Sequence, residues 1–188
     1  MVTSGMLQRF LVAIALIGAA KGSQILINPG FESGSLSPWF EGQVFDGTNW
    51  TISSTNCHTG SFCATNNGNN ELDQTFTSIP VGEITDISFY ALHTSASVIA
   101  LAVDLLYAGG GDDEFVVDTT GTSWNFFDVT SDLRTTGSLI GIGFFGNSAG
   151  VTFLDDASIT ATTSAPEPAS AAFLLVGLGV LAAAARRR

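Results

Sequence analysis

Hydrophobic and polar positions alternate with a period of two along most of the chain, from Gln24 to Ile159. Short runs of β-branched and aromatic residues recur there and predict strands at residues 88–92, 98–106, 115–117, 124–129, 139–145 and 151–159. Turn-forming sequences separate these runs, at residues 66–68, 109–112, 119–121 and 146–147. Six or more strands within about 140 residues, with no amphipathic helix between them, predict an all-β fold built as a β-sandwich.

The N-terminal pattern is different. Arg9 precedes an unbroken apolar run from Phe10 to Ala20, and small residues follow it up to Gly22. A positive charge, an apolar run and a small-residue exit are typical of a secretory signal peptide, which we expect at residues 1–22. Cleavage after Gly22 or after Ala20 fits the pattern. The run is too short to span a bilayer as an anchor.

The C-terminal pattern is again apolar. Ala169 to Ala185 holds only apolar or small residues, and it is followed by Arg186, Arg187 and Arg188. As a helix this span reaches about 25 Å, against a hydrocarbon core of about 30 Å, so it predicts a transmembrane helix. By the positive-inside rule the arginines hold the C-terminus on the cytoplasmic side.

Pro166, Glu167 and Pro168 stand directly before this span. The order of a Pro-Glu-Pro triplet, a Gly/Ala/Leu-rich span and terminal arginines resembles the PEP-CTERM sorting signal of Gram-negative bacteria. The resemblance implies an exosortase as partner, processing near the motif, and delivery to the cell envelope or the extracellular, exopolysaccharide (biofilm) matrix. It divides the chain into a signal peptide (1–22), a body (24–160), a linker (161–165) and a sorting signal (166–188) that anchors the protein transiently in the membrane. The alternative is a plain C-terminal anchor.

The charge of the chain excludes one class of partner. The 188 residues hold 17 Asp and Glu against 6 Lys and Arg, a net charge of −11. Residues 24–165 contain 16 of these acids and a single basic residue, Arg134, which gives that part a net charge of −15. A basic surface for nucleic acid is therefore excluded. Most of the acids are expected to form a solvated surface that keeps an exported domain soluble.

Five segments of the body carry a further pattern: Asn28 to Trp39 (NPGFESGSLSPW), His58 to Phe62 (HTGSF), Gln74 to Phe89, Trp124 to Phe127, and Phe153 to Ile159 (FLDDASI). In this order they resemble the strands of galactose-binding-like jelly rolls related to carbohydrate-binding modules. The resemblance implies that the sandwich is an antiparallel jelly roll, flanked by the signal helix and the C-terminal hydrophobic helix. It does not decide the function, because this fold hosts many.

Cys57 and Cys63 are the only cysteines of an exported chain. An even count in an oxidising compartment favours one disulfide that closes the loop between them. Closing so small a loop contributes about 2 kcal/mol of stability in the chain-entropy model. Free thiols, or a metal site that includes His58, are the alternatives.

Asp155 lies in the predicted closing strand. Strict alternation would place Asp155 on one face with Phe153, Ala157 and Ile159. A carboxylate among apolar residues needs a partner, because a buried unpaired charge is costly. Arg134 is one candidate partner and a hard cation is another, since calcium binds carboxylate and carbonyl oxygens.

The jelly-roll resemblance implies the cation. In galactose-binding-like jelly rolls the first and last strands lie close together and often share a structural Ca²⁺. On that resemblance the expected metal ligands are Glu32 and Asp155, with Asp156 as the substitute ligand. The alternative is a protonated or hydrogen-bonded Asp155 without a metal.

Aromatic side chains are candidates for sugar binding, because the apolar faces of sugars pack on rings. Trp39 and Trp124 coincide with pattern positions of the fold and are expected in the core, whereas Trp50, in a polar segment, is the candidate for an exposed ligand-binding platform. No nucleophile elbow, HExxH or phosphate loop occurs. We therefore expect a non-catalytic component of the envelope or exopolysaccharide matrix. The alternatives are a specific carbohydrate-binding module and, third, a glycan-active enzyme with two acids converging in a cleft.

Overall fold

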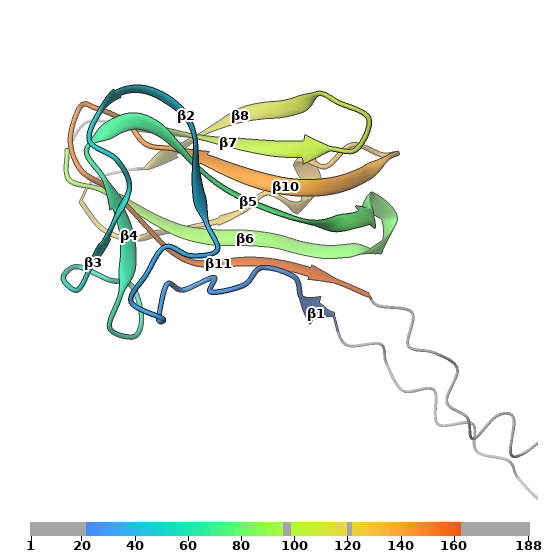
Figure 1. Cartoon of the computed structure of the whole chain (residues 1–188), viewed down its shortest axis with the longest axis horizontal. Helices are drawn as coiled ribbons and strands as arrows, with labels where there is room; N and C mark the ends of the chain where they lie inside the picture. Colours follow the sequence, from blue (N-terminus) through green and yellow to red (C-terminus); the bar gives the residue numbers. More distant parts are fainter. Residues whose placement is uncertain (1–21, 96–98, 120–121, 163–188) are drawn as a thin grey trace, which may run out of the picture.

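Two antiparallel β-sheets packed face to face form the body of the protein (Figure 1). The computed structural model describes residues 22–95, 99–119 and 122–162. Apart from Gly22, the predicted signal peptide (1–22) lies outside the described residues, as do residues 163–165 of the linker and the predicted sorting signal with its apolar span (166–188). The described part of the chain contains no helix long and apolar enough to cross a membrane.

The first sheet has the strand order β3-β4-β11-β6-β9, with β1 paired to β11. Its strands are β1 (Ser23–Gln24), β3 (Thr51–Ser53), β4 (Cys63–Asn66), β6 (Ile84–His93), β9 (Asn125–Asp128) and β11 (Thr152–Ala161). Short 3₁₀ turns, η1 (Val81–Glu83) and η2 (Thr130–Asp132), precede β6 and follow β9. Ser23 pairs with Ala161, so the body begins and ends at the same place in this sheet.

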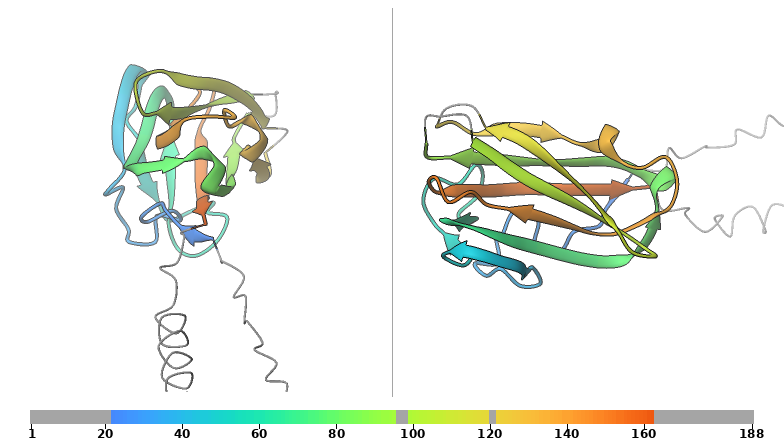
Figure 2. Two further views of the ribbon diagram at one scale, coloured as in Figure 1. Left: turned by 90° about the vertical axis from the view of Figure 1, so that its right-hand side faces the viewer. Right: turned by 90° about the horizontal axis from the view of Figure 1, so that it is seen from above.

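The second sheet has the order β2-β5-β10-β7-β8, and Figure 2 shows its strands stacked over the first sheet. Its strands are β2 (Phe40–Gly47), β5 (Gly68–Pro80), β7 (Ile99–Tyr107), β8 (Asp112–Thr119) and β10 (Ser138–Phe145). The predicted antiparallel β-sandwich is therefore confirmed. The six strands predicted from periodicity correspond to β6 through β11. The segment from His58 to Phe62, matched to a strand by resemblance, is instead a loop that ends where β4 begins.

The core between the sheets is rich in aromatic side chains. Phe89 of β6 meets Phe144 of β10 edge to face, with ring centroids 4.9 Å apart, and Trp39 lies 6.0 Å from the same Phe144 ring. Phe31, Phe89 and Phe144 are completely buried. Aromatic burial of this extent contributes more to the stability of the domain than any single polar contact, because each ring removes a large apolar area from water.

A β-bulge in β11 corrects the predicted orientation of Asp155. Asp155 pairs with Tyr90, but Ser158 pairs with Ser88, so β11 contains one extra residue at this point. An extra residue reverses the alternation of faces along the strand. Ile159 accordingly packs in the main core between the sheets. Phe153 and Asp155 lie on the opposite, outer face of the first sheet, where Phe153 joins a second small apolar cluster.

Candidate functional site

A groove crosses the outer face of the second sheet. It consists of two adjoining hollows with volumes of about 220 Å³ and about 340 Å³, and Gln43, Asp104 and Asp112 line both of them. Further polar and aromatic side chains line one of the two hollows: Phe45, Asn69, Glu71, Asp73, Glu114 and Phe145.

The register of the sheet places acidic residues in one row across this groove. Asp73 of β5 pairs with Gly143 of β10, Gly143 pairs with Asp104 of β7, and Asp104 pairs with Glu114 of β8. Directly paired residues project from the same face of a sheet. The residues that alternate with them along their strands face the core instead: Leu72, Val103, Leu105 and Phe144. The acids therefore stand on the outer face.

Gly143 keeps the middle of the row free of side chains. A Cβ atom at this position would lie 2.5 Å from Asp73 Oδ1 and 2.5 Å from Glu71 Oε1. A Cβ atom on Gly42 of β2 would overlap the same two carboxylates from the other side. Only glycine allows so close an approach, because it carries no side chain. The carboxylates of Glu71 and Asp73 therefore occupy the space above the backbone of the neighbouring strands and form the floor of the groove.

Two acids at the floor of the groove have raised pKa values. Burial, followed by the negative charge of Glu71, raises the pKa of Asp73 to about 8. Burial and the charges of Glu71, Glu114 and Asp112 raise the pKa of Asp104 to about 7. Among the described residues, Asp73 Oδ1 and Asp104 Oδ1 are the buried side-chain oxygens that have no hydrogen-bond partner. Perturbed acids in a concave site are a physical mark of function.

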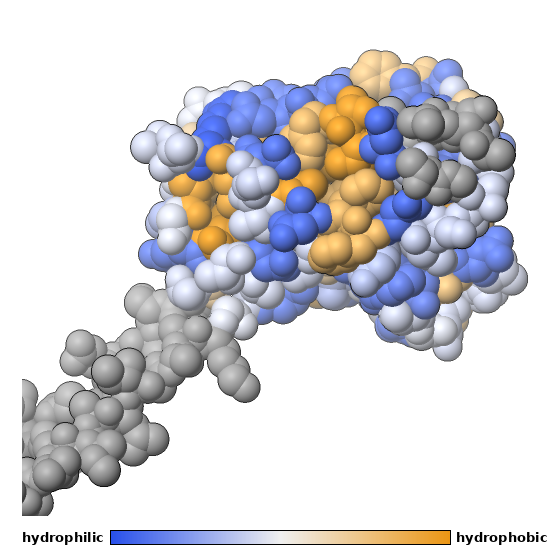
Figure 3. All heavy atoms as spheres, turned by 180° about the vertical axis from the view of Figure 1, so that it is seen from behind, coloured by the Kyte–Doolittle hydropathy of each residue, from blue (hydrophilic) through white to orange (hydrophobic). Residues whose placement is uncertain are grey.

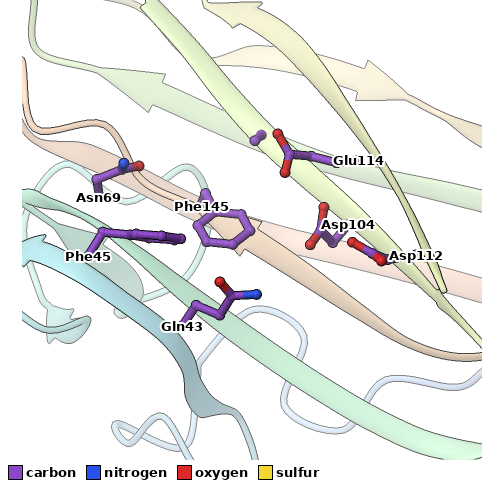
Figure 4. A pocket seen from close by; sticks show the side chains of 8 residues that line it. Gln43, Phe45, Asn69, Asp104, Asp112, Glu114 and Phe145 are labelled. Atoms are coloured by element: carbon purple, nitrogen blue, oxygen red, sulfur yellow. The ribbon is translucent and has the colours of Figure 1, made fainter. Parts of the chain in front are cut away.

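Aromatic and amide side chains form the other wall of the groove. Figure 4 shows Phe45 of β2 and Phe145 of β10 next to each other, with Asp104, Asp112 and Glu114 facing them and Gln43 below. The two rings are tilted, with centroids 5.8 Å apart. Phe45 is 60% exposed, so its ring is available to a ligand. The groove thus combines an apolar surface, amides and carboxylates, the three kinds of group that bind sugars.

Exposed hydrophobic residues also occur elsewhere. Among the described residues, large hydrophobic side chains outside the groove are exposed at Ile27, Phe40, Val44, Val116 and Phe126. Figure 3, which shows the molecule from behind, has hydrophobic residues gathered between hydrophilic ones on that face as well. The groove is therefore distinguished by its combination of rings and acids rather than by hydrophobicity alone.

The prediction that Trp50 is an exposed platform is wrong. Trp50 is 3% exposed and belongs to the main core. Its indole Nε1 donates a hydrogen bond to the backbone oxygen of Asn70 (2.8 Å), and its backbone N–H donates to Glu41 Oε1 (2.7 Å). The polar neighbours of Trp50 in sequence suggested exposure, but a buried tryptophan needs one hydrogen-bond acceptor, which the backbone of β5 supplies.

The predicted disulfide between Cys57 and Cys63 is present. It closes a loop that lies over the outer face of the first sheet. The ring of His58 stacks on Tyr90 of β6 at 3.6 Å between centroids, and its Nδ1 lies 2.7 Å from Asp156 Oδ2. The disulfide therefore closes the loop, and His58 holds the start of the loop against β6 and β11.

Glu32 and Asp155, the predicted metal ligands, both contact this loop. Glu32 accepts hydrogen bonds from the backbone N–H groups of Ser61 and Phe62, each at 3.0 Å. The backbone of Gly60, with φ of 61°, passes so close to the Glu32 carboxylate that a Cβ atom would overlap it. The Glu32 side chain thus joins the N-terminal segment to the disulfide loop.

Asp155 is completely buried beneath the loop. Its Oδ2 accepts hydrogen bonds from the backbone N–H groups of His58 (2.9 Å) and Thr59 (3.2 Å), and its Oδ1 accepts one from Asp156 (2.8 Å). Burial raises the pKa of Asp155, while these N–H donors act against the rise. Arg134, one predicted partner of Asp155, instead pairs with Asp113, with Nη2 and Oδ1 2.6 Å apart.

The acids around the loop carry carboxylates, the kind of ligand that a hard cation takes. The nearest oxygens of Asp155 and Asp156 lie 3.6 Å and 3.3 Å from the position of a Cβ atom on Gly30, and Glu32 Cγ lies 3.9 Å from it. Within the described ranges, no three Asp, Glu, His or Cys side chains are grouped to hold a metal by themselves. A cation at this position would take backbone carbonyl oxygens in addition, as calcium does.

The sandwich of two antiparallel sheets is a fold that this chain shares with solved carbohydrate-binding modules. A search of the solved structures finds similar folds at low sequence identity. TmCBM61 in complex with β-1,4-galactotriose has a TM-score of 0.56 and 22% identity over 74% of this chain and 99% of its own. The CBM22-1 xylan-binding domain of Paenibacillus barcinonensis Xyn10C has a TM-score of 0.53 and 17% identity over 78% of this chain and 99% of its own. A family 16 carbohydrate-binding module has a TM-score of 0.53, with 13% identity over 72% and 98%.

A comparison with protein families identifies the C-terminal segment of the chain. Residues 164–188 match the PEP-CTERM protein-sorting motif, which includes the predicted signal residues. These residues are Pro166, Glu167, Pro168, Arg186, Arg187 and Arg188. The chain is therefore an exported, envelope-associated protein whose body has the fold of a carbohydrate-binding module. A search of the curated proteins finds no match to the chain.

The groove itself was missed by sequence reasoning. Asp112 and Glu114 were among the acids expected on a solvated surface; both are exposed, and they belong to β8 and line the groove. Glu71 and Asp73 stand in a polar stretch without strong β-propensity. A usable signal was the alternation of acids with Leu72, Val103 and Leu105, which marks acids on the outer face of two strands.

Proposed function

We propose that the body binds a glycan in the groove of the second sheet, as a non-catalytic domain that the sorting tail delivers to the envelope or exopolysaccharide matrix. The observation that carries this proposal is the pair Phe45 and Phe145 opposite a row of carboxylates. Rings accept the apolar face of a sugar, and carboxylates accept hydrogen bonds from its hydroxyl groups. Two neighbours of the same fold, the TmCBM61 complex with β-1,4-galactotriose and the CBM22-1 xylan-binding domain, support this choice.

The test is binding of the full-length protein, purified in a polyoxyethylene detergent that carries no sugar, to a glycan array and to isolated exopolysaccharide. The proposal expects selective binding that Phe45→Ala weakens. Phe126→Ala is the matched control, because Phe126 is a similarly exposed phenylalanine (56%) on β9 of the other sheet. Folded protein that binds no glycan would overturn the proposal.

Cleavage of the glycan is a second candidate, favoured by one observation. Asp73, whose burial raises its pKa, lies beside Glu71 in the groove, and glycoside hydrolysis uses a pair of acids. New reducing ends released from a bound glycan, and lost in Asp73→Asn, would favour the enzyme over the binding domain. Stable binding without release would exclude it.

We further propose that calcium stabilises the protein at Glu32 and Asp155, with Asp156 as the substitute ligand. Calcium would supply charge compensation for three acids that lie around Gly30. It would act on stability, by joining the N-terminal segment, the disulfide loop and β11, and it would lie on the other sheet from the groove.

A further inference from the structure

The groove carries negative charge without a positive counterpart. Its five carboxylates belong to Glu71, Asp73, Asp104, Asp112 and Glu114. In the part of the chain that the structure describes, no Lys, Arg or His lines it. The nearest basic group, Arg134, lies over the Tyr107 ring at one end of the groove, and its Nε and Nη2 donate to Asp113 at 2.8 Å and 2.6 Å. Its charge is thus already engaged.

Two acids of the floor have acceptor capacity that the protein does not use. Asp73 and Asp104 are 7% and 3% exposed, and within the described ranges Oδ1 of each has no hydrogen-bond partner. A buried carboxylate oxygen without a donor destabilises the folded state. Burial, followed by the negative charge of Glu71, raises the pKa of both acids, and a hydrogen bond with the Glu71 carboxyl group acts in the same direction. A ligand with a positively charged N–H donor would supply the missing hydrogen bond and would also balance the negative charge.

The groove also selects against a simple metal ion. Among the described residues, no three Asp, Glu, His or Cys side chains are grouped around one point as a metal requires. The opposite wall, with Phe45 and Phe145, gives a metal nothing to bind, whereas it suits the apolar face of a sugar ring. The ligand must therefore combine a ring of that kind with a positive charge.

We propose that the glycan bound in the groove is built of amino sugars with free amino groups. The ammonium groups donate hydrogen bonds to the free oxygens of Asp73 and Asp104, and a sugar ring packs against Phe45. Charge-assisted hydrogen bonds of this kind are stronger than those from hydroxyl groups. This inference rests on the glycan-binding function proposed above and names the class of its ligand.

The test compares three β-1,4-linked oligomers of equal length that differ only at carbon 2 of each sugar. The oligomers are those of glucosamine (ammonium), N-acetylglucosamine (acetamide) and glucose (hydroxyl). Binding to the full-length protein in sugar-free detergent is measured by calorimetry near pH 7, where a large share of the sugar amines is protonated and Asp104, with a pKa of about 7, is about half ionised. The glucosamine oligomer should bind at least about tenfold more tightly than the other two.

Variants of the floor acids test which carboxylate binds the ammonium groups. Asp104→Asn keeps the size of the side chain, removes its charge, and should weaken glucosamine binding by about tenfold or more. Asp73→Asn serves as the second variant if the first one unfolds. The matched control is Asp132→Asn, which removes one negative charge from the exposed η2 turn and should leave binding unchanged.

The outcomes separate this inference from the proposed function. Equal or tighter binding of the glucose or N-acetylglucosamine oligomer would overturn the amino-sugar ligand and leave glycan binding intact. Folded protein that binds none of the oligomers, nor any glycan on the array, would overturn both. Binding of Ca²⁺ or Mn²⁺ alone that is lost in Asp104→Asn would make the groove a metal site and overturn the inference.

Discussion

Asp73 of β5 and Asp104 of β7 flank Gly143 of the intervening strand β10, and in the described structure one oxygen of each buried carboxylate has no hydrogen-bond partner. A sheet face normally fills such a position with a side chain from the middle strand. Glycine leaves it open, and the two acids therefore remain available to a ligand at the cost of stability. The predictions below follow from this arrangement and from the loop on the other sheet.

Stability should fall as pH rises through neutrality. The pKa values of Asp73 and Asp104 are raised from 3.8 to about 8 and about 7, so the folded state keeps protons that the unfolded chain releases. Their favourable contribution is complete below the unfolded pKa and is lost as pH rises through the folded pKa values. Thermal unfolding followed by circular dichroism should show a higher Tm at about pH 5 than at about pH 8.5.

Asp104→Asn should flatten this pH dependence. The amide cannot ionise, so at alkaline pH the variant should be more stable than the wild type by about 1–3 kcal/mol. Asp132→Asn, with its carboxylate in an exposed turn, should keep the wild-type pH profile. Parallel profiles for Asp104→Asn and the wild type would contradict the assigned pKa of Asp104.

Gly143→Ala should close the groove. The new methyl group would lie 2.5 Å from carboxylate oxygens of Asp73 and Glu71, so those side chains must move. We expect a loss of about 1–3 kcal/mol in unfolding free energy and a loss of glycan binding. Gly82→Ala is the control, because a Cβ atom on Gly82 meets nothing within 4 Å. Unchanged binding by a folded Gly143→Ala protein would place the ligand elsewhere.

Phe45→Ala should weaken binding without weakening the fold. The ring is 60% exposed, so its removal costs little packing, and surface changes of this kind shift stability by about 0.5 kcal/mol. Loss of one stacked ring should lower glycan affinity by about tenfold. Calorimetry on this variant and on Phe126→Ala gives the comparison, and equal affinities of the two would speak against the groove.

Reduction of the Cys57–Cys63 disulfide should lower the free energy of unfolding by about 2 kcal/mol. The reason is that the unfolded chain regains the conformational entropy that the closed loop had removed. The loop also covers Asp155, whose carboxylate accepts hydrogen bonds from His58 and Thr59 in it. Denaturant unfolding with and without reductant measures the loss. The double variant Cys57→Ala/Cys63→Ala should be insensitive to reductant, and a shift there would point to a different cause.

Calcium should raise the Tm of the wild type relative to excess chelator, and Asp155→Ala should abolish that rise. Binding at about 100 times the dissociation constant corresponds to about 2.7 kcal/mol of stabilisation. The variant is expected to be less stable in either condition, since Asp155 accepts three backbone hydrogen bonds. The informative quantity is thus the calcium-dependent difference, with Glu32→Gln as a second variant. An identical difference in the wild type and both variants would remove the calcium site.

The fold could be predicted to a large extent from local pattern. Strands β6 to β11 show the period-two alternation directly, and the two cysteines could be paired because they are the only cysteines of a chain expected to be exported. Strands β2 and β5 were not evident from periodicity, because β2 is exposed along almost its whole length and the first half of β5 is polar; only the second half of β5 was matched, by resemblance. In β11 the prediction for Asp155 was wrong at one step, since a bulge is a property of strand pairing and leaves no mark on a single strand.

The sequence by itself determined the all-β class, the acidic charge, the single disulfide and the sorting tail, because each of these depends on residues close together in the chain. The tertiary structure alone decided that Trp50 is buried and that Glu71, Asp73 and Asp104 meet in one groove. Those acids stand on strands β5 and β7, which touch opposite sides of β10 and come from distant parts of the sequence. Long-range strand order sets which side chains become neighbours, and it sets their burial and pKa, so the candidate site emerges only when the sheet has formed.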